Sequence, residues 1–232
     1  MDSARVRAGA RECRLRTRPE LRRGNNAYGG ATSHRLKVRA TMTTDTAIAP
    51  DGLEVEISMK TLDLTRENWG TLGQHNGNVG LLLPLRQPPL HFYRYLVDRI
   101  GRKWHWQDSL CLSDADLAAR IHAPQRDMRL LLIEGAPAGF FDLDRRDKET
   151  VEIVYLGLME HVAGRGFGKW LLSEAMAAAF SADVRRIVLK TCSLDHPAAL
   201  AIYKKAGFRV VADVPMAMRL LTLDQRGAIL LR

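Results

Sequence analysis

The chain has 232 residues, of which 46% are hydrophobic, and it carries a formal net charge of +9 at pH 7. This length suits one domain with a sizeable core plus an appendage. Its three cysteines, Cys13, Cys111 and Cys192, share no metal-like spacing, which predicts a reducing compartment and no metal site. No apolar stretch reaches transmembrane length, so we expect a cytoplasmic protein without a membrane partner.

The positive charge is concentrated at the N-terminal end. Residues 1–41 hold eleven Lys and Arg against three Asp and Glu, which leaves 24 basic and 23 acidic residues in 42–232. The remainder of the chain is therefore nearly neutral, and we do not expect nucleic acid as its partner.

Residues 1–41 lack an apolar run and any periodicity, so we predict a disordered basic tail. The tail has no apolar h-region, which excludes a secretory signal. Three alternatives stay open: a polybasic arm for nucleic acid, an Arg-rich transit peptide, or an over-extended start. The change of composition at Met42 favours translation from Met42.

The first predicted strand is Leu53–Met59, where apolar and polar side chains alternate. Residues 66–80 are polar and contain glycine, which predicts a loop. A helix is predicted over Leu90–Ile100, with Gly101 as its end. The aromatic cluster Trp104–Trp106 that follows is interpreted as packing.

A short helix is predicted to begin after Ser113, whose hydroxyl suits an N-cap, and to run through Ile121–His122. Two strands, Met128–Ile133 and Ala138–Asp144, flank the tight turn Glu134–Pro137. We therefore predict a β-hairpin in this part of the chain.

A glycine-rich turn connects the next predicted strand, Val151–Met159, to a helix. The turn reads HVAGRGFGKW over His161–Trp170. Glycines let a ligand approach the backbone, and the first-turn N–H groups and the helix dipole favour negative charge there. We predict a phosphate-binding turn; the alternative is a turn that serves chain reversal alone. The spacing fits neither the dinucleotide fingerprint nor the P-loop, because Lys169 replaces the third glycine and Trp170 follows the Gly-Lys pair.

The remaining elements alternate between strand and helix. A strand is predicted over Arg186–Thr191 and a helix over Ala198–Lys205, with Gly207 as its C-cap. Two further strands are predicted, one from Phe208 and one over Met216–Leu221.

The glycine turn and the segment Asp195–Val211 together resemble the GCN5-related N-acetyltransferase (GNAT) family. That family has a pyrophosphate loop at a helix start, followed by a Tyr-bearing helix that ends in Gly-Phe, and both occur here in that order. The resemblance covers residues 85–220. It implies an α/β (α+β) fold with a mixed, mostly antiparallel central sheet and helices on both faces. We accordingly place the family's domain at 85–222, with 42–84 as a strand and loop leading into it.

The resemblance also implies a function. GNAT enzymes transfer an acetyl group from acetyl-CoA to an amine by direct attack, so we expect an N-acetyltransferase for a primary amine of a small-molecule or amino-acid-like acceptor. Carboxylates on or between the two strands nearest the expected acceptor cleft are compatible with a cationic amine: Asp142, Asp144, Glu149 and Glu152. The charge of the acceptor stays open, because Arg145, Arg146 and Lys148 share the region. The alternative is a degenerate acyl-CoA-binding module with a sensing or interaction role. A homodimer is left open.

The family's pattern carries cofactor contacts onto ten residues. They are Leu156, Gly157, Leu158, Gly164, Arg165, Gly166, Phe167, Gly168, Lys169 and His196. The sequence departs from the pattern twice, because Ala163 stands where Gln or Arg opens the loop and His196 stands where Asn is common. The first departure removes a side-chain contact to the pyrophosphate, for which Arg165 or Lys169 compensates in this interpretation.

Two residues are predicted to be catalytic by the same resemblance. Tyr203 corresponds to the family's general acid near the thioester sulfur, and its alternative is a core aromatic residue. Glu152, thirteen residues before Arg165, corresponds to the family's general base. Strand alternation places Glu152 on one face with Val154 and Leu156, and half-burial there would raise its pKa, which suits a base. The alternative is an edge carboxylate paired with Arg145, Arg146 or Lys148.

Overall fold

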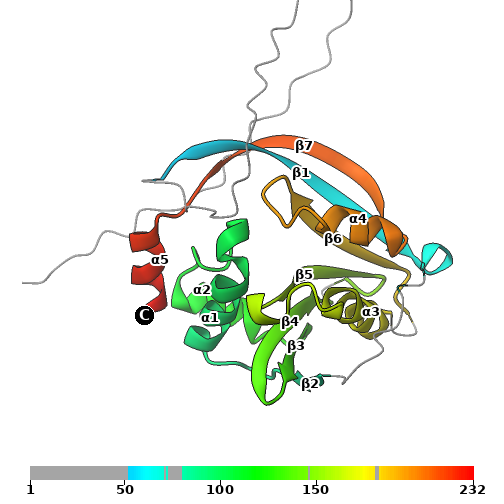
Figure 1. The fold of residues 1–232 in the computed structure, drawn as a ribbon, viewed down its shortest axis with the longest axis horizontal. Coiled ribbons are helices and arrows are strands. Elements are labelled where there is room, and N and C mark those ends of the chain that lie inside the picture. Colours follow the sequence, from blue (N-terminus) through cyan, green and yellow to red (C-terminus); the bar gives the residue numbers. More distant parts are fainter. Residues whose placement is uncertain (1–51, 71, 73–79, 146, 181–182) are drawn as a thin grey trace, which may run out of the picture. The chain divides into compact units, whose positions relative to one another are not determined.

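The computed structural model describes residues 52–70, 72, 80–145, 147–180 and 183–232. These residues form seven strands and five α-helices (Figure 1). The strands are β1 (Glu54–Thr65), β2 (Leu81–Pro84), β3 (Arg126–Ile133), β4 (Ala136–Asp144), β5 (Thr150–Leu158), β6 (Arg186–Cys192) and β7 (Arg209–Arg219). The helices are α1 (Leu90–Gly101), α2 (Asp114–Ile121), α3 (Phe167–Ala179), α4 (Ala199–Lys205) and α5 (Leu223–Leu230). The predicted basic tail lies outside the described residues.

All seven strands belong to one sheet, in the order β2-β3-β4-β5-β6-β1-β7. Every neighbouring pair is antiparallel except β5 and β6, which run parallel. The predicted mixed, mostly antiparallel sheet is therefore confirmed. The first strand, β1, lies between β6 and the last strand, β7. Its long pairing with β7 is seen at the top of Figure 1.

The sheet divides between β5 and β6. These strands pair only from Thr150 to Ile153 of β5 and from Arg186 to Leu189 of β6. Beyond that point β5 stays paired with β4, up to Leu158, while β6 stays paired with β1. We call this divergence the strand split. On the side of the split, no described strand pairs with the last five residues of β5.

A β-bulge marks the residue at which β5 leaves β6. In the β4–β5 register Asp142 pairs with Tyr155 and Leu143 with Ile153, so Val154 is the extra residue. Val154 and Tyr155 consequently both pack toward α1 and α2, whereas Leu156 packs toward α3. The predicted shared face of Glu152, Val154 and Leu156 is wrong at Leu156, because simple alternation cannot anticipate an inserted residue.

Two hydrophobic cores cover the two faces of the sheet. Phe141 and Leu143 of β4 belong to the core that packs against α3. Phe140 of β4 and Tyr155 of β5 belong to the core that packs against α1 and α2. Helices thus cover both faces, as predicted.

A cluster of charged and polar groups is buried beneath α1. Arg126 of β3 hydrogen-bonds Asp142 and Asp144 of β4, the latter at 3.1 Å. Tyr93 Oη donates to Asp142 Oδ2 at 2.8 Å. The four side chains are almost fully buried, and burial raises the pKa of Asp142. Because buried charges are tolerated only when paired, this cluster holds α1 over the two strands.

The observed elements differ from the predicted ones at β7, β2 and α5. β7 is one continuous strand where two were predicted, and it contains Pro215, which an edge strand tolerates because it needs no donor on its free side. Neither β2 nor α5 was predicted. The helix α1 ends at Gly101, as predicted, and continues into a 3₁₀ turn over Arg102–Trp104; a Cβ at Gly101 would overlap the side chain of Trp106.

Other local predictions are confirmed. The hairpin turn forms at Glu134 and Gly135, which both have positive φ. Ser113 Oγ caps α2 by accepting from the amide of Asp116 at 3.1 Å. Gly207 follows α4 with φ of +100°, in the left-handed region that a C-cap needs.

We expect Gly207→Ala to lower the free energy of unfolding by about 2–4 kcal/mol. Its φ disfavours any side chain, and a Cβ would overlap the backbone carbonyl of Asn68. Gly227→Ala is the matched control, because Gly227 lies exposed inside α5 with open space around it. The control should stabilise by about 0.5–1 kcal/mol through helix propensity. Urea denaturation of both variants measures this, and equal effects would contradict the account of Gly207.

Candidate functional site

The glycine turn leads from the end of β5 into α3. A short 3₁₀ segment, Glu160–Val162, is followed by Gly164 and Gly166, whose φ values are +77° and +86°. The left-handed backbone at Gly166 directly precedes the first residue of α3, and no side chain caps this helix. The amides of its first turn have no intrahelical acceptors, so this end of the helix suits an anion.

The turn has room for a ligand. A Cβ at Gly164 would meet no atom within 4 Å, and one at Gly168 would meet only Leu158 Cδ1, at 3.7 Å. Two cations lie beside the turn and are exposed, Arg165 and Lys169. The Arg165 guanidinium lies 5.5 Å from the centre of the Phe167 ring. Backbone amides and exposed cations together fit a phosphate ester.

The strand split borders the turn at Leu156–Leu158. Leu156 and Leu158 pack against the α3 core and pair with β4, so the backbone edge without a strand partner is the one toward β6. On the opposite face, a Cβ at Gly157 would lie 2.5 Å from Ile100 Cγ2 and 2.9 Å from the Trp106 ring. Trp106 therefore lies directly over β5 at the split.

Asp195 links the two sides of the split. Its carboxylate accepts from Thr191 Oγ1 at 2.6 Å and from the Cys192 amide at 2.9 Å, which fixes it to the end of β6. It also accepts from Trp106 Nε1 at 3.2 Å. Next to it, the ring of His196 lies 5.0 Å from that of Trp104. The aromatic segment after α1 thus reaches across to the loop before α4.

Tyr203 lies on α4, and its ring contacts Phe208 edge-on at 6.0 Å. Burial raises the pKa of its hydroxyl, and the negative charge of Asp195 raises it further. Among the described residues, none hydrogen-bonds this hydroxyl. The side chain therefore stays protonated at neutral pH and keeps a proton to donate.

Glu152 lies in the paired part of β5, opposite Val188 of β6 and before the split. Its carboxylate is partly exposed and forms an ion pair with Lys190 of β6, with Oε1 3.5 Å from Nζ. The partner is thus neither Arg145 nor Lys148, the two described cations that the sequence had suggested. Asp142 and Asp144, proposed as acceptor carboxylates, are instead bound by Arg126.

The segment that carries Trp106 is anchored by the C-terminal part of the chain. Arg226 of α5 donates to Asp98 of α1 at 3.1 Å and to the Trp106 carbonyl at 3.1 Å. Gln107 donates to the Arg219 carbonyl at 2.6 Å and accepts from the Leu221 amide at 3.0 Å. Sequence analysis missed this function of α5 because its contacts lie more than 110 residues away in the chain.

Two residues beside the split were not predicted as part of the site, Trp106 and Asp195. The Trp-His-Trp run was the available signal for the first, and it was interpreted as packing alone. Packing is indeed part of its role, since the Trp106 and Tyr155 rings lie 5.0 Å apart. Asp195 was not singled out, because its role beside the split depends on the distant Trp106, although its other two donors, Thr191 and Cys192, are neighbours in β6.

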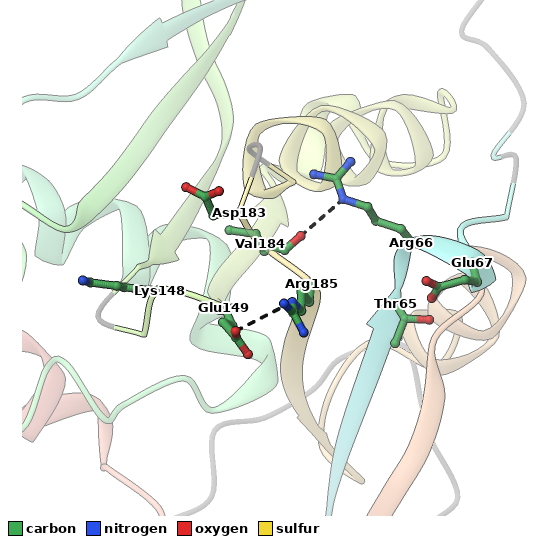
Figure 2. Close-up of a pocket in the computed structure, with 8 residues that line it drawn as sticks. All are labelled: Thr65, Arg66, Glu67, Lys148, Glu149, Asp183, Val184 and Arg185. Atoms are coloured by element: carbon green, nitrogen blue, oxygen red, sulfur yellow. Dashed lines mark hydrogen bonds and ion pairs between the residues drawn. The ribbon is translucent and has the colours of Figure 1, made fainter.

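A hollow of about 840 Å³ lies at the opposite end of these strands (Figure 2). Its walls come from residues 65–67, 148–149 and 183–185, which precede β5 and β6 or follow β1. Charged groups there pair with one another, as Arg185 does with Glu149 at 3.7 Å. The full length of β5 separates this hollow from the glycine turn, so Glu149, which the sequence analysis placed near the acceptor side, lies away from the other predicted site residues.

Two features are absent from the described residues. No helix there is long and apolar enough to cross a membrane. No group of three or more His, Cys, Asp or Glu side chains there is arranged to hold a metal ion.

The strand split and the glycine turn both lie in the part of the chain that matches a known protein family. The model of the acetyltransferase (GNAT) family matches residues 93–208, half of the chain. The chain belongs to this family. The match begins in α1, ends just before β7, and includes all of the predicted GNAT site residues. No curated protein matches the sequence.

Solved structures show the same GNAT fold at low identity. A GCN5-related N-acetyltransferase from Sphaerobacter thermophilus matches with a TM-score of 0.52 and 13% identity, over 70% of this chain and 51% of that one. A functionally unknown conserved protein from Staphylococcus epidermidis matches with a TM-score of 0.50 and 13% identity, over 72% and 64%. The chain thus spans between half and two thirds of these two proteins.

We expect Arg226→Met to lower the free energy of unfolding by about 3–5 kcal/mol, because it leaves the buried Asp98 with Arg102 as its remaining cation. Chemical denaturation and tryptophan fluorescence measure the effect on stability and on the Trp106 segment. Arg99→Met is the control, since Arg99 pairs with Glu160 at the surface and should contribute less than about 1 kcal/mol. Equal losses of unfolding free energy in the two variants would show that the Arg226–Asp98 pair does not stabilise the packing of α5 on α1.

Proposed function

We propose that this chain transfers an acetyl group from acetyl-CoA to a primary amine of a small-molecule or amino-acid-like acceptor. The observation that carries the proposal is the glycine turn at the uncapped start of α3, directly after the strand that leaves its neighbour. Membership of the acetyltransferase (GNAT) family supports the reaction type.

In this proposal the amides at the start of α3 bind the pyrophosphate of acetyl-CoA. Arg165 and Lys169 supply the positive charge that Ala163 cannot. The free backbone edge of Leu156–Leu158 binds the amides of the pantetheine arm, which takes the place of a missing β-strand. His196, exposed at the start of the loop before α4, borders the same arm.

The chemistry needs an unprotonated amine and a proton for the departing thiolate. The amine nitrogen attacks the thioester carbonyl, the carbon–sulfur bond breaks, and Tyr203 donates its hydroxyl proton to the sulfur. The raised pKa of Tyr203 keeps that proton available over the whole neutral range. Glu152 stays the base that the family resemblance predicts, and its carboxylate is held by Lys190.

We expect the full chain to bind acetyl-CoA with micromolar affinity in a calorimetric titration, roughly −8 kcal/mol. Lys169→Glu should weaken binding about tenfold, because it reverses one charge next to the phosphates, which corresponds to about 1.4 kcal/mol. Lys148→Glu makes the same charge change in the turn before β5 and should leave the affinity unchanged.

Each outcome of this titration bears on the proposal. No binding by the full chain would contradict the proposed cofactor site and assign a functional loss to Ala163. If Lys169→Glu and Lys148→Glu weaken acetyl-CoA binding equally, the loss follows from the net charge of the protein and not from the position of Lys169 at the glycine turn. Binding with no transfer to any amine would favour an acyl-CoA-binding module.

Tyr203→Phe should reduce kcat by about 10²-fold, the usual contribution of a general acid, and change the Kd for acetyl-CoA less than twofold. The ring contact with Phe208 survives in this variant, so stability should change little. Rates are followed by release of the free thiol of CoA. An unchanged kcat would remove Tyr203 from the mechanism and leave it as a packing residue of α4.

A further inference from the structure

The two-stranded ribbon of β1 and β7 has one polar side and one apolar side. Leu62 and Leu64 of β1 belong to the core that packs against α3, so strand alternation turns the odd-numbered side chains of β1 to the opposite side of the sheet. Between residues 55 and 59 these side chains, and those of their partners on β7, are all apolar. Together they form what we call the apolar ribbon face: Val55, Ile57, Met59, Val214, Met216 and Met218.

The apolar ribbon face is incompletely covered. Ile57 is buried, but Val214 is 55% exposed and the other four side chains are half-buried. The opposite side of the ribbon carries polar groups instead, among them Glu56, Lys60 and Asp213. Because an amphipathic ribbon normally packs its apolar side on a core, a partly open apolar side indicates that a ligand or partner covers it.

The apolar ribbon face is continuous with the strand split and with the proposed base. Glu152 forms an ion pair with Lys190 of β6, so both side chains lie on the same side of the sheet. Cys192, two residues further along β6, shares that side and pairs with Met59, which in turn pairs with Val214. At about 4.8 Å per strand, the row Cys192–Met59–Val214 spans roughly 10 Å from β6 to β7.

This row carries no charge. It presents a thiol, a thioether and an isopropyl group, and burial raises the pKa of the Cys192 thiol, which keeps it neutral. Along β6, the nearest charged side chains on this side are Lys190 and its partner Glu152, while Asp195 beyond the strand is held by three donors. The row thus suits hydrocarbon, since a second charged group placed on it would lose water without gaining a partner.

A second copy of the chain fits this face less well than a small molecule does. Six side chains fall short of the about 20–30 residues that each partner contributes to a stable protein interface. The free edge of β7 also resists strand addition, because Pro215 offers no backbone donor and Val211 is an extra residue in the pairing with β1. The size of the face therefore favours a small ligand.

We propose that the row Cys192–Met59–Val214 binds the hydrocarbon body of the acceptor, and that the acceptor is a primary amine with an apolar alkyl or aryl group and no second charge. The inference rests on the acetyl transfer proposed above and keeps Glu152 as its base. With its body on this row, such an acceptor has its amine end toward the strand split, on the side of the sheet where Glu152 lies.

The test compares n-hexylamine with cadaverine in the full chain at saturating acetyl-CoA. The two amines have the same number of non-hydrogen atoms and differ only at the far end, where cadaverine has a second ammonium group in place of a methyl group. We expect kcat/KM to be about 10²-fold higher for n-hexylamine, because the second ammonium group would be desolvated on the row. In the series ethylamine, n-butylamine and n-hexylamine, kcat/KM should rise about threefold per methylene group.

Val214→Asp places a carboxylate at the outer end of the row and should lower the preference for n-hexylamine over cadaverine about tenfold or more. Val210→Asp is the matched control, because Val210 is also exposed on β7 but pairs with Leu62 on the α3 side of the sheet. The control should keep the preference. Comparing two amines within one variant cancels any loss of folded protein, and the Kd for acetyl-CoA should be the same in all three proteins.

A calorimetric titration of n-hexylamine into the full chain with free CoA separates binding from transfer. Equal kcat/KM values for n-hexylamine and cadaverine, or the same loss of preference in Val210→Asp, would overturn the inference while the acetyl transfer stands. Binding of n-hexylamine without its acetylation would contradict the proposed function and leave the binding surface in place. Neither binding nor acetylation of any of the four amines would overturn the inference. A dimer in sedimentation velocity that Val214→Asp dissociates would assign the face to a second copy instead.

Discussion

The rest of the site depends on the interruption of pairing between β5 and β6. Four residue pairs join these strands, and after Ile153 and Leu189 each continues with its other neighbour alone. Unpaired backbone groups inside a protein are costly, so such an edge persists only where water or a ligand satisfies it. The bulge at Val154 begins the divergence, and the glycine turn follows at its far end.

Long-range contacts hold the segment after α1 beside this opening. Arg226 and Gln107 fasten the segment after α1 to the C-terminal part of the chain, and Asp195 fastens it to β6. The two tryptophans of that segment consequently lie against residues of the split and of the loop before α4. This side of the opening is therefore built from three separate regions of the chain, brought together by buried or partly buried hydrogen bonds.

Sequence reasoning predicted the features with a local physical cause. The left-handed cap at Gly207, the hairpin at Glu134–Gly135 and the N-cap at Ser113 each follow from residues within a few positions. Sequence reasoning failed where a distant partner decides. Leu156 changes face because of the bulge against β4, and α5 has little local pattern beyond its capping box.

The sequence by itself determined the family, the glycine turn before α3 and the Tyr-bearing helix, because these depend on glycine and helix-end chemistry within short segments. The tertiary structure alone decided that β1 lies inside the sheet, that Arg126 occupies Asp142 and Asp144, and that Lys190 pairs with Glu152. Those outcomes follow from strand register and buried-charge pairing. Both are set by residues far apart in the chain, which no local pattern records.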